Sequence, residues 1–378
     1  MKAARILSLS YEYPPLGGGG AGVVLGLTHA LTVTGTRVDL MTMGYGDLPA
    51  VESIGQLRIR RIGRFRTRIH MCSAAEMIPY VIAAAFHAIR AAKAGGYALN
   101  HTHFVFPDGV VAYLLKRATG LKYVLTAHGS DVPNYNPDRF GLLHRLLRPL
   151  WLRVTSEAEC IVCSSRALRA LILRANPTAR VTLIPNGIDC AKFSPNGVKR
   201  DRILIVTRMF PRKGVQHLLR ALAALRTDYE VNIVGDGPYR ETMQELAREL
   251  AVPARFWGTL DNSSPQLKEL YETSRIFVFP SETENFPIVL LEAMTAGLAI
   301  ITTGNTGCEE VVGDSALLVN AGSPAAIASR LGELIANPAL CERLGRGARR
   351  RAEEFFDWPR VAEQYRRVFD GVCADPAD

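Results

Sequence analysis

Two carboxylates, Glu284 and Glu292, stand with seven residues between them in the stretch SETENFPIVLLEAMTAG. The preceding RIFVFP is aromatic and β-branched, which predicts a buried strand. Pro287 suits the first turn of a helix, Asn285 is a candidate N-cap, and Gly297 suits the helix end. Glu284 is therefore expected in the turn after a strand, and Glu292 inside the following helix. In an open α/β sheet such a turn is where ligands bind, and carboxylates suit hydroxyl donors.

Cations and glycines follow two other predicted strands. Arg208, Arg212 and Lys213 come directly after the strand RILIVT. Cations at the carboxyl end of a strand are placed to hold a diphosphate, although a solvated position fits Arg212 best. Residues 17–20, all glycine, follow the first strand and allow backbone N–H groups to approach phosphate at a helix N-terminus. This turn is neither a Walker loop nor G-x-G-x-x-G, which disfavours a triphosphatase or a dehydrogenase, and a flexible turn is the alternative.

A polar segment, LTAHGSDV, ends another strand and contains His128 and Asp131. Polar residues at that point of an α/β sheet indicate function more often than a histidine on an apolar helix does. His101 and His103 are expected nearby, and a structural role is at least as good an interpretation for either. A zinc site is disfavoured because no acidic or cysteine partner has ligand spacing.

The candidate site residues follow predicted strands, and along most of the chain predicted strands alternate with predicted helices. Ten strands are predicted, at residues 5–11, 37–43, 123–129, 160–165, 181–185, 202–210, 229–237, 254–260, 275–281 and 298–304. The alternation predicts an α/β fold with two doubly wound parallel sheets, each in its own domain. A segment rich in Pro, Gly and Asn, residues 184–201, is a good linker between them. We expect domains at 1–185 and 186–358, with a helix near 359–378 completing the first and a cleft between the two.

Length and charge narrow the class of protein. The chain has 378 residues, 48% of them hydrophobic, and seven scattered cysteines that fit a reducing compartment. No signal peptide and no long apolar run are apparent, so we expect a cytoplasmic protein. Residues 1–185 carry 22 Lys and Arg against 10 Asp and Glu, a balance of +12, whereas the remainder carries 23 against 26, or −3. A basic amino-terminal half indicates an anionic partner on that side only.

Taken together, the motifs resemble one family. ETENFPIVLLEAM is similar to the E-x7-E element of family 4 glycosyltransferases, which are retaining enzymes with the GT-B fold. The glycine turn, HGSD, IPNGID, the cations, IVGDGP, FWGTL and EEVVGDSALLV follow in the order that this family shows. The resemblance covers nearly the whole chain. Its closing stretch, FFDWPRVAEQYRRVF, is similar to the family's terminal helix, which braces the amino-terminal domain.

The resemblance implies a role for each residue. Glu292 would accept hydrogen bonds from the donor's ribose, and Glu284 would contact the donor sugar. Arg208 and Lys213 would stabilise the leaving diphosphate, and His128 would hold the donor sugar. The expected donor-binding set also includes backbone near Gly18, Gly19, Phe286, Pro287, Ile288 and Val289. Pro287 departs from the family's glycine-rich pattern and removes one N–H from that set.

The resemblance therefore implies a retaining, metal-independent hexosyltransferase with no cofactor besides its nucleotide-sugar donor. UDP-sugars are weakly preferred over GDP-sugars, and the acceptor is expected to be a glycan or a lipid-linked glycan of the cell envelope or an exopolysaccharide. The alternatives are a GT-B epimerase or hydrolase, a transferase for a small soluble acceptor, or a non-catalytic sugar-nucleotide binder. No recognised module supports nucleic-acid binding.

The location of the protein is suggested by the stretch LRIRRIGRFRTRIH, residues 57–70. It holds six arginines and no acid. A solvated strand edge is one interpretation. The other is docking on anionic lipid at the inner face of the cell membrane, where each basic residue adds about 1 kcal/mol.

Overall fold

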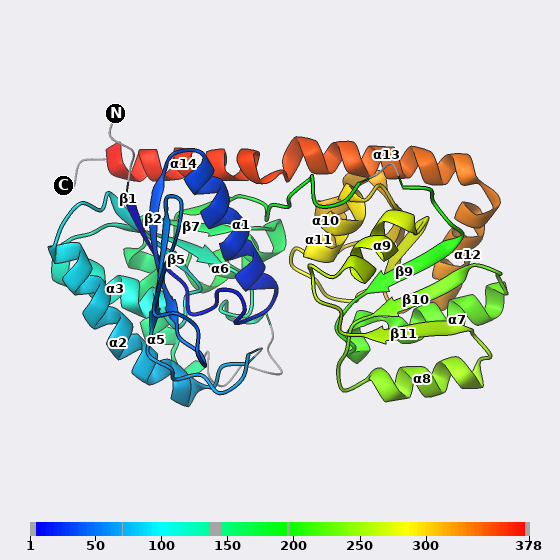
Figure 1. Ribbon diagram of the computed structural model, residues 1–378, viewed down its shortest axis with the longest axis horizontal. Coiled ribbons are helices and arrows are strands. Elements are labelled where there is room, and N and C mark those ends of the chain that lie inside the picture. Colours follow the sequence, from blue (N-terminus) through cyan, green and yellow to red (C-terminus); the bar gives the residue numbers. More distant parts are fainter. Residues whose placement is uncertain (1–4, 70, 136–144, 195–196, 375–378) are drawn as a thin grey trace. The chain divides into compact units, whose positions relative to one another are not determined.

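The computed structural model describes residues 5–69, 71–135, 145–194 and 197–374 (Figure 1). The chain forms two compact α/β units. The first unit comprises Met1–Gly187 together with Trp358–Asp378, and the second comprises Ile188–Asp357. The division lies inside the segment that the sequence marks as a linker. None of the helices in these described ranges is long and apolar enough to cross a membrane.

The first unit is built on an eight-stranded sheet in the order β3-β4-β2-β1-β5-β6-β7-β8. Its strands are β1 (Arg5–Leu9), β2 (Arg37–Met43), β3 (Val51–Ile54), β4 (Leu57–Ile62), β5 (Leu99–His103), β6 (Tyr123–Ala127), β7 (Cys160–Cys163) and β8 (Val181–Leu183). Every neighbouring pair is parallel except β3 and β4. β3 is an antiparallel strand at the edge of an otherwise parallel sheet, and it is not among the predicted strands. Gly55 has a φ of +57°, and it allows a tight turn that folds β3 back on β4.

Helices cover both faces of this sheet. They are α1 (Gly19–Val33), α2 (Ala74–Lys93), α3 (Asp108–Thr119), α5 (Arg148–Glu157), α6 (Arg166–Ala175) and α14 (Trp358–Ala374). Successive residues of β1 alternate between the two layers. Leu7 and Leu9 pack in the core with α2, α3, α5 and α6, whereas Ile6 packs in the core with α1 and α14. In Figure 1 the red α14 lies against the blue α1, so the last helix closes a core begun by the first.

The second unit has a six-stranded parallel sheet in the order β11-β10-β9-β12-β13-β14. Its strands are β9 (Arg202–Val206), β10 (Glu230–Val234), β11 (Ala254–Gly258), β12 (Ile276–Phe279), β13 (Ala299–Thr303) and β14 (Leu317–Val319). The strand order reverses between β9 and β12. Loops at the carboxyl ends of such a pair leave in opposite directions, and ligands of open α/β sheets bind at that point.

The helices of the second unit also form two layers. They are α7 (Val215–Leu225), α8 (Arg240–Glu249), α9 (Pro265–Thr273), α10 (Ile288–Thr295), α11 (Gly307–Val312), α12 (Pro324–Ala336) and α13 (Pro338–Phe355), with short 3₁₀ turns η1 (Pro211–Lys213) and η2 (Gly313–Ser315). Helices α9, α10, α11 and α13 share one core, and α7, α8 and α12 share the other. All ten strands predicted from the sequence are present.

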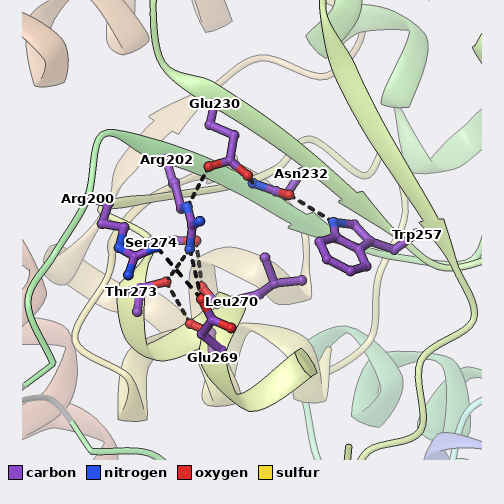
Figure 2. A network of polar contacts seen from close by, with 9 residues as sticks. All are labelled: Arg200, Arg202, Glu230, Asn232, Trp257, Glu269, Leu270, Thr273 and Ser274. Carbon is purple, nitrogen blue, oxygen red and sulfur yellow. Dashed lines mark hydrogen bonds and ion pairs between the residues drawn. The ribbon is translucent and has the colours of Figure 1, made fainter. Parts of the chain in front are cut away.

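A polar network fixes the amino ends of the central strands (Figure 2). The guanidinium of Arg202 donates to Glu230 at 2.6 Å and to the hydroxyl of Thr273 at 2.8 Å. The buried Asn232 then donates to Glu230 at 3.1 Å and accepts from the indole of Trp257 at 2.8 Å. This network joins the first residues of β9 and β10 to the end of α9, and through Asn232 it reaches Trp257 near the carboxyl end of β11.

Candidate functional site

The site of the second unit begins at the turn between β12 and α10. Glu284 lies in this turn and Glu292 lies inside α10, as the sequence predicts. The prediction that Asn285 caps the helix is wrong, because α10 begins at Ile288 with Pro287 in the N-cap position and no side-chain cap. The backbone of residues 284–285 instead packs on Gly307. A Cβ on Gly307 would lie 1.7 Å from the carbonyl oxygen of Asn285. The backbone N–H of Gly307 donates to the carbonyl of Glu284 at 3.1 Å.

Glu284 forms an ion pair with Lys213, and both side chains are almost buried, at 12% and 10% exposure. The same carboxylate oxygen accepts a hydrogen bond from the hydroxyl of Ser281 at 2.7 Å. Lys213 ends η1, and the turns after β9 and β12 are joined because Glu282 N–H donates to the carbonyl of Arg212 at 2.8 Å. The structure thus brings together two residues that the sequence predicts for the site. Lys213 follows β9 and Glu284 follows β12, and the strand order reverses between these two strands, at the switch point of the sheet.

Arg208 is placed differently from Lys213. Its side chain is exposed, and its guanidinium carbon lies 5.8 Å from the ring centre of Phe210. Within the described ranges it forms no ion pair with a carboxylate. The site therefore has one cation held by a carboxylate and one whose charge is available to an anionic ligand.

Glu292 is buried, and each of its carboxylate oxygens has a partner. The ammonium of Lys192 donates to Oε1 at 2.5 Å, and the hydroxyl of Tyr271 donates to Oε2 at 2.9 Å. Neither partner is predicted from the sequence. Lys192 is 100 residues away along the chain and Tyr271 is 21 residues away, so no spacing pattern could reveal them. A carboxylate has about four lone-pair positions, so Glu292 retains capacity to accept hydrogen bonds from a ligand hydroxyl.

The start of α10 presents fewer groups to a ligand than the sequence predicts. The side chain of Phe286 is buried in the core, where its ring lies 5.6 Å from that of Phe356 in an edge-on arrangement, and Pro287 is also buried. Only Ile288 and Val289 are partly exposed. Since no side chain caps the helix, the first turn of α10 has backbone N–H groups that suit an anion.

The glycine turn of the first unit is open where a ligand would approach. Gly18 and Gly19 are exposed, and a Cβ at either position would meet no atom within 4 Å. Helix α1 begins here without a side-chain cap and without an acidic residue in its first turn. Gly20 faces inward, since a Cβ there would lie 2.8 Å from the ring of Phe104 and 3.8 Å from Nδ1 of His128. The structure therefore places His128 beside the glycine turn.

His128 is held in place by Asp131. One carboxylate oxygen of Asp131 accepts from the backbone N–H groups of His128 and Gly129, at 3.0 and 2.8 Å, and the other accepts from Val105 N–H at 2.9 Å. Asp131 is buried and shapes the loop. In the motif HGSD the aspartate therefore accepts hydrogen bonds from the loop backbone and holds it in the conformation that positions the histidine.

A column of three histidines runs back from the site into the core. Nε2 of His128 lies 3.2 Å from Nδ1 of His103, and the ring centres of His103 and His101 are 4.3 Å apart. Burial lowers the pKa of His101 to about 3 and that of His128 to about 4, and it holds the pKa of His103 well below its usual range. All three are therefore neutral at pH 7.

The surroundings of His103 favour one tautomer for His103 and, through it, one tautomer for His128. Nε2 of His103 is buried and has no hydrogen-bond partner in the parts of the chain that are described. An unpaired lone pair is less costly than an unpaired N–H, which places the proton of His103 on Nδ1. That N–H then donates to Nε2 of His128, and the proton of His128 is on Nδ1, toward the glycine turn.

The basic stretch of residues 57–70 does not act as one surface, and His70 lies outside the described residues. Arg61 is paired with Glu52 at 2.9 Å. The side chain of Arg66 has 0% exposure, lies 3.6 Å from Glu12, and donates at 2.9 Å to the carbonyl of Ile69, which also accepts from Gly17 N–H. Arg66 therefore has a structural role that is not predicted from the sequence, because it supports the glycine turn through the carbonyl of Ile69.

No group of three or more His, Cys, Asp or Glu side chains within the described ranges is arranged to hold a metal ion.

Comparison with known proteins identifies the family. The model for "Glycosyltransferase Family 4" matches residues 17–192, and the model for "Glycosyl transferases group 1" matches residues 191–351. The chain is 28% identical over 404 residues to α-maltose-1-phosphate synthase of Mycobacterium tuberculosis, which covers 98% of this chain and 100% of that protein.

Solved structures share the fold over the full length. Sucrose-phosphate synthase of Thermosynechococcus elongatus has a TM-score of 0.80 at 23% identity and covers 98% of this chain and 99% of that one. HepE of Anabaena, solved with UDP and glucose, has a TM-score of 0.73 at 17% identity and covers 97% of this chain and 100% of that one. The two parallel-sheet α/β units are those of GT-B glycosyltransferases, and with both family models matched along its length, this chain belongs to glycosyltransferase family 4.

Proposed function

We propose that this glycosyltransferase is a retaining hexosyltransferase that moves a sugar from a nucleoside diphosphate to a glycan or lipid-linked acceptor. The observation that supports this most directly is the pairing of Lys213 with Glu284 at the switch point of the second unit, with the buried Glu292 on the adjoining helix. A cation for a diphosphate and two carboxylates for hydroxyl groups match the two ends of a nucleotide sugar.

In this proposal Glu292 binds the ribose and Glu284 the donor sugar. Arg208, Lys213 and the start of α10 stabilise the charge that develops on the leaving diphosphate, at about 3 kcal/mol for each well-placed donor. The donor phosphate competes with Glu284 for Lys213, so binding exchanges one anionic partner of this lysine for another.

His128 holds the sugar, with its backbone carbonyl near the anomeric carbon. The acceptor oxygen forms the new bond on the face from which the diphosphate leaves, and a diphosphate oxygen takes the acceptor's proton. Charge is compensated by protein groups, and we propose that neither a metal ion nor another cofactor takes part.

The donor is proposed to be a UDP-sugar in preference to a GDP-sugar. HepE was solved with UDP and glucose, and its backbone follows this chain over nearly its whole length. A thermal-shift comparison of UDP, GDP and their sugars tests the base, since a ligand that binds only the folded state raises the melting temperature.

Kinetics of the two glutamate variants test the site. Glu292→Ala is expected to weaken donor binding by about 1–3 kcal/mol, because the ribose loses a charged acceptor. Glu284→Ala is expected to depress kcat more than donor affinity.

Removing the charge of Arg208 or Lys213 is expected to lower kcat by about 10²-fold. Wild-type activity in Glu284→Ala would refute the assignment, and loss of activity in EDTA with recovery on adding a divalent metal would refute the metal-free mechanism.

We further propose that the enzyme works at an anionic membrane surface, on a lipid-linked or cell-envelope acceptor. Helix α2 exposes three apolar side chains one turn apart, Ile78, Ile82 and Phe86, at 64%, 67% and 61% exposure. Arg64 and Arg68 are exposed in the segment that precedes this helix. An apolar stripe flanked by cations is typical of helices that lie in a membrane interface.

Vesicle co-sedimentation tests the membrane proposal. Binding is expected to require anionic lipid, to decrease with salt, and to be lost when Ile82 and Phe86 are replaced by Ser. Equal binding to neutral and anionic vesicles, or none at low salt, would contradict it.

A second candidate is a transferase for a small soluble acceptor. Two similar proteins, α-maltose-1-phosphate synthase and sucrose-phosphate synthase, are named for sugar-phosphate products. Product analysis with free sugars and sugar phosphates as acceptors separates the two candidates, because only the soluble enzyme transfers to them without vesicles.

A further inference from the structure

We propose that the first unit has a second binding site, for a phosphate-bearing anion, in an open cavity of about 290 Å³ between β4 and the end of α2. The side chains that give the cavity its charge come from three elements of the sheet and one helix. They are Arg5, Asp39, Arg58, Arg60 and Arg90. This inference does not depend on the proposed reaction.

The cavity lies at the opposite edge of the sheet from the glycine turn and His128. Arg5 is the first residue of β1, and Tyr97, which also lines the cavity, comes just before β5. The glycine turn, in contrast, follows the carboxyl end of β1, and His128 follows the carboxyl end of β6. A ligand in the cavity is therefore separate from a donor bound at the carboxyl edge.

The charges of the cavity are not balanced. Its one carboxylate, Asp39, is already occupied, because Arg5 and the hydroxyl of Tyr97 both donate to its Oδ2 at 2.6 Å. The guanidinium of Arg5 also lies 4.6 Å from the ring centre of Tyr97, which holds it at the wall. Arg58, Arg60 and Arg90 form no ion pair with any carboxylate in the described ranges.

The fold itself keeps these arginines together. β4 is an interior strand, bonded to β2 on one side and β3 on the other, so its side chains have fixed faces. Arg58 and Arg60 share one face with Ile62, which packs in the core beneath α2. Arg90 lies in the last turn of that helix. Three guanidinium groups are thus concentrated without counter-charge, and a bound anion would relieve their repulsion.

The ligand class follows from geometry and size. A guanidinium presents a planar fork of donors that matches phosphate oxygens in pairs, and a phosphate monoester carries nearly two charges at pH 7. The cavity volume lies at the small end of the range for ligand pockets, which suits a phosphate ester or a diphosphate better than a whole nucleotide sugar.

The same phosphate chemistry has two sources, a soluble metabolite and a lipid headgroup. Arg90 lies four residues after Phe86, so the cavity continues the exposed apolar stripe of α2. Pyrophosphate tests the soluble source, and vesicles that contain phosphatidic acid test the lipid source.

Pyrophosphate binding by calorimetry is the first arm. It uses the full chain carrying Arg208→Gln and Lys213→Gln, so that the donor site does not contribute. Adding Arg58→Gln, Arg60→Gln and Arg90→Gln is expected to weaken binding by about tenfold or more, since charge-assisted hydrogen bonds are lost. The matched control is Arg117→Gln, Arg169→Gln and Arg174→Gln, which removes three exposed charges of the same unit, away from the membrane-binding stripe of α2. Its affinity is expected to stay within about twofold of the parent.

Vesicles are the second arm, with phosphatidylcholine carrying either phosphatidic acid or an equal charge of phosphatidylserine. Preferential binding to phosphatidic acid that the cavity variant loses, and the control keeps, assigns the site to a lipid phosphomonoester. Cavity-dependent pyrophosphate binding without this preference assigns it to a soluble ligand. If both arms show no binding, or the two triple variants behave alike, the proposal is overturned, and the donor-site proposal is untouched.

Discussion

Each of the two glutamates is bound to a lysine of its own. Glu284 is paired with Lys213, which lies on the neighbouring turn, whereas Glu292 is paired with Lys192, which lies at the start of the second unit. Both carboxylates are thereby positioned before any ligand arrives. A buried charge without such a partner is costly, so each lysine is required for the glutamate that it contacts.

Lys192→Met is expected to lower the free energy of unfolding by about 1–3 kcal/mol, because Glu292 is then left buried with only a tyrosine partner. The Lys192 side chain is 27% exposed, so solvent screens part of the loss. Denaturant unfolding measures this change. Lys268→Met is the matched control, since its ion pair with Glu272 spans 3.9 Å at 57% exposure of the lysine. Equal stability of the two variants would show that Lys192 contributes nothing.

At the scale of elements, the turn from β12 to α10 depends on a glycine in another helix. Gly307 is the first residue of α11, and the backbone of residues 284–285 lies directly on it. Two short helices and two strand ends therefore hold Glu284 in position. This contact is separate from the pairing of Glu284 with Lys213.

Gly307→Ala is expected to destabilise the second unit by about 1–3 kcal/mol, because the added methyl group must displace the backbone of residues 284–285. Gly347→Ala is the control in helix α13, where the new Cβ meets its nearest atom at 3.8 Å. That change is expected to be neutral or to stabilise by up to about 1 kcal/mol, since alanine favours helix. Thermal unfolding of both variants checks the difference, and an unchanged melting temperature for Gly307→Ala would contradict it.

The elements were largely predictable, and the contacts between them were not. Strand–helix alternation and the motif order indicate the fold, because parallel strands are apolar throughout and each is followed by a helix. Strands β3, β4, β5 and β14 are not among the ten predicted strands. The partnership of Lys192 with Glu292 and the burial of Arg66 also escaped, because side-chain packing between distant segments has no signature in local sequence.

At the scale of the whole molecule, buried ionisable groups couple folding to pH. Burial lowers the pKa of His101 to about 3 and of His128 to about 4, and it lowers that of His103 as well. In the unfolded chain histidine titrates near pH 6.5. Below that pH the unfolded chain takes up protons that the folded chain does not, so stability decreases as pH falls.

One carboxyl group opposes the histidines. Burial raises the pKa of Asp108 to about 7, so this group is protonated in the folded chain first and favours folding as pH falls. With three histidines against one carboxyl, the free energy of unfolding is expected to drop by roughly 3 kcal/mol between pH 6.5 and 5. Urea unfolding at the two pH values measures it. A constant or rising stability over this interval would mean that the histidines are charged in the folded protein.

Helix α14 has a consequence for how the protein is made. Its residues Val361, Ala362, Tyr365 and Phe369 complete a core of the first unit, yet a ribosome adds them only after the whole second unit. The second unit is one continuous segment, Ile188–Asp357, and all of it leaves the ribosome before α14 does. The apolar surface of α1 therefore stays uncovered in the nascent chain while the second unit is synthesised. Of the two units, the one that is begun first is the one that is completed last, and it is the one that a chaperone would have to protect.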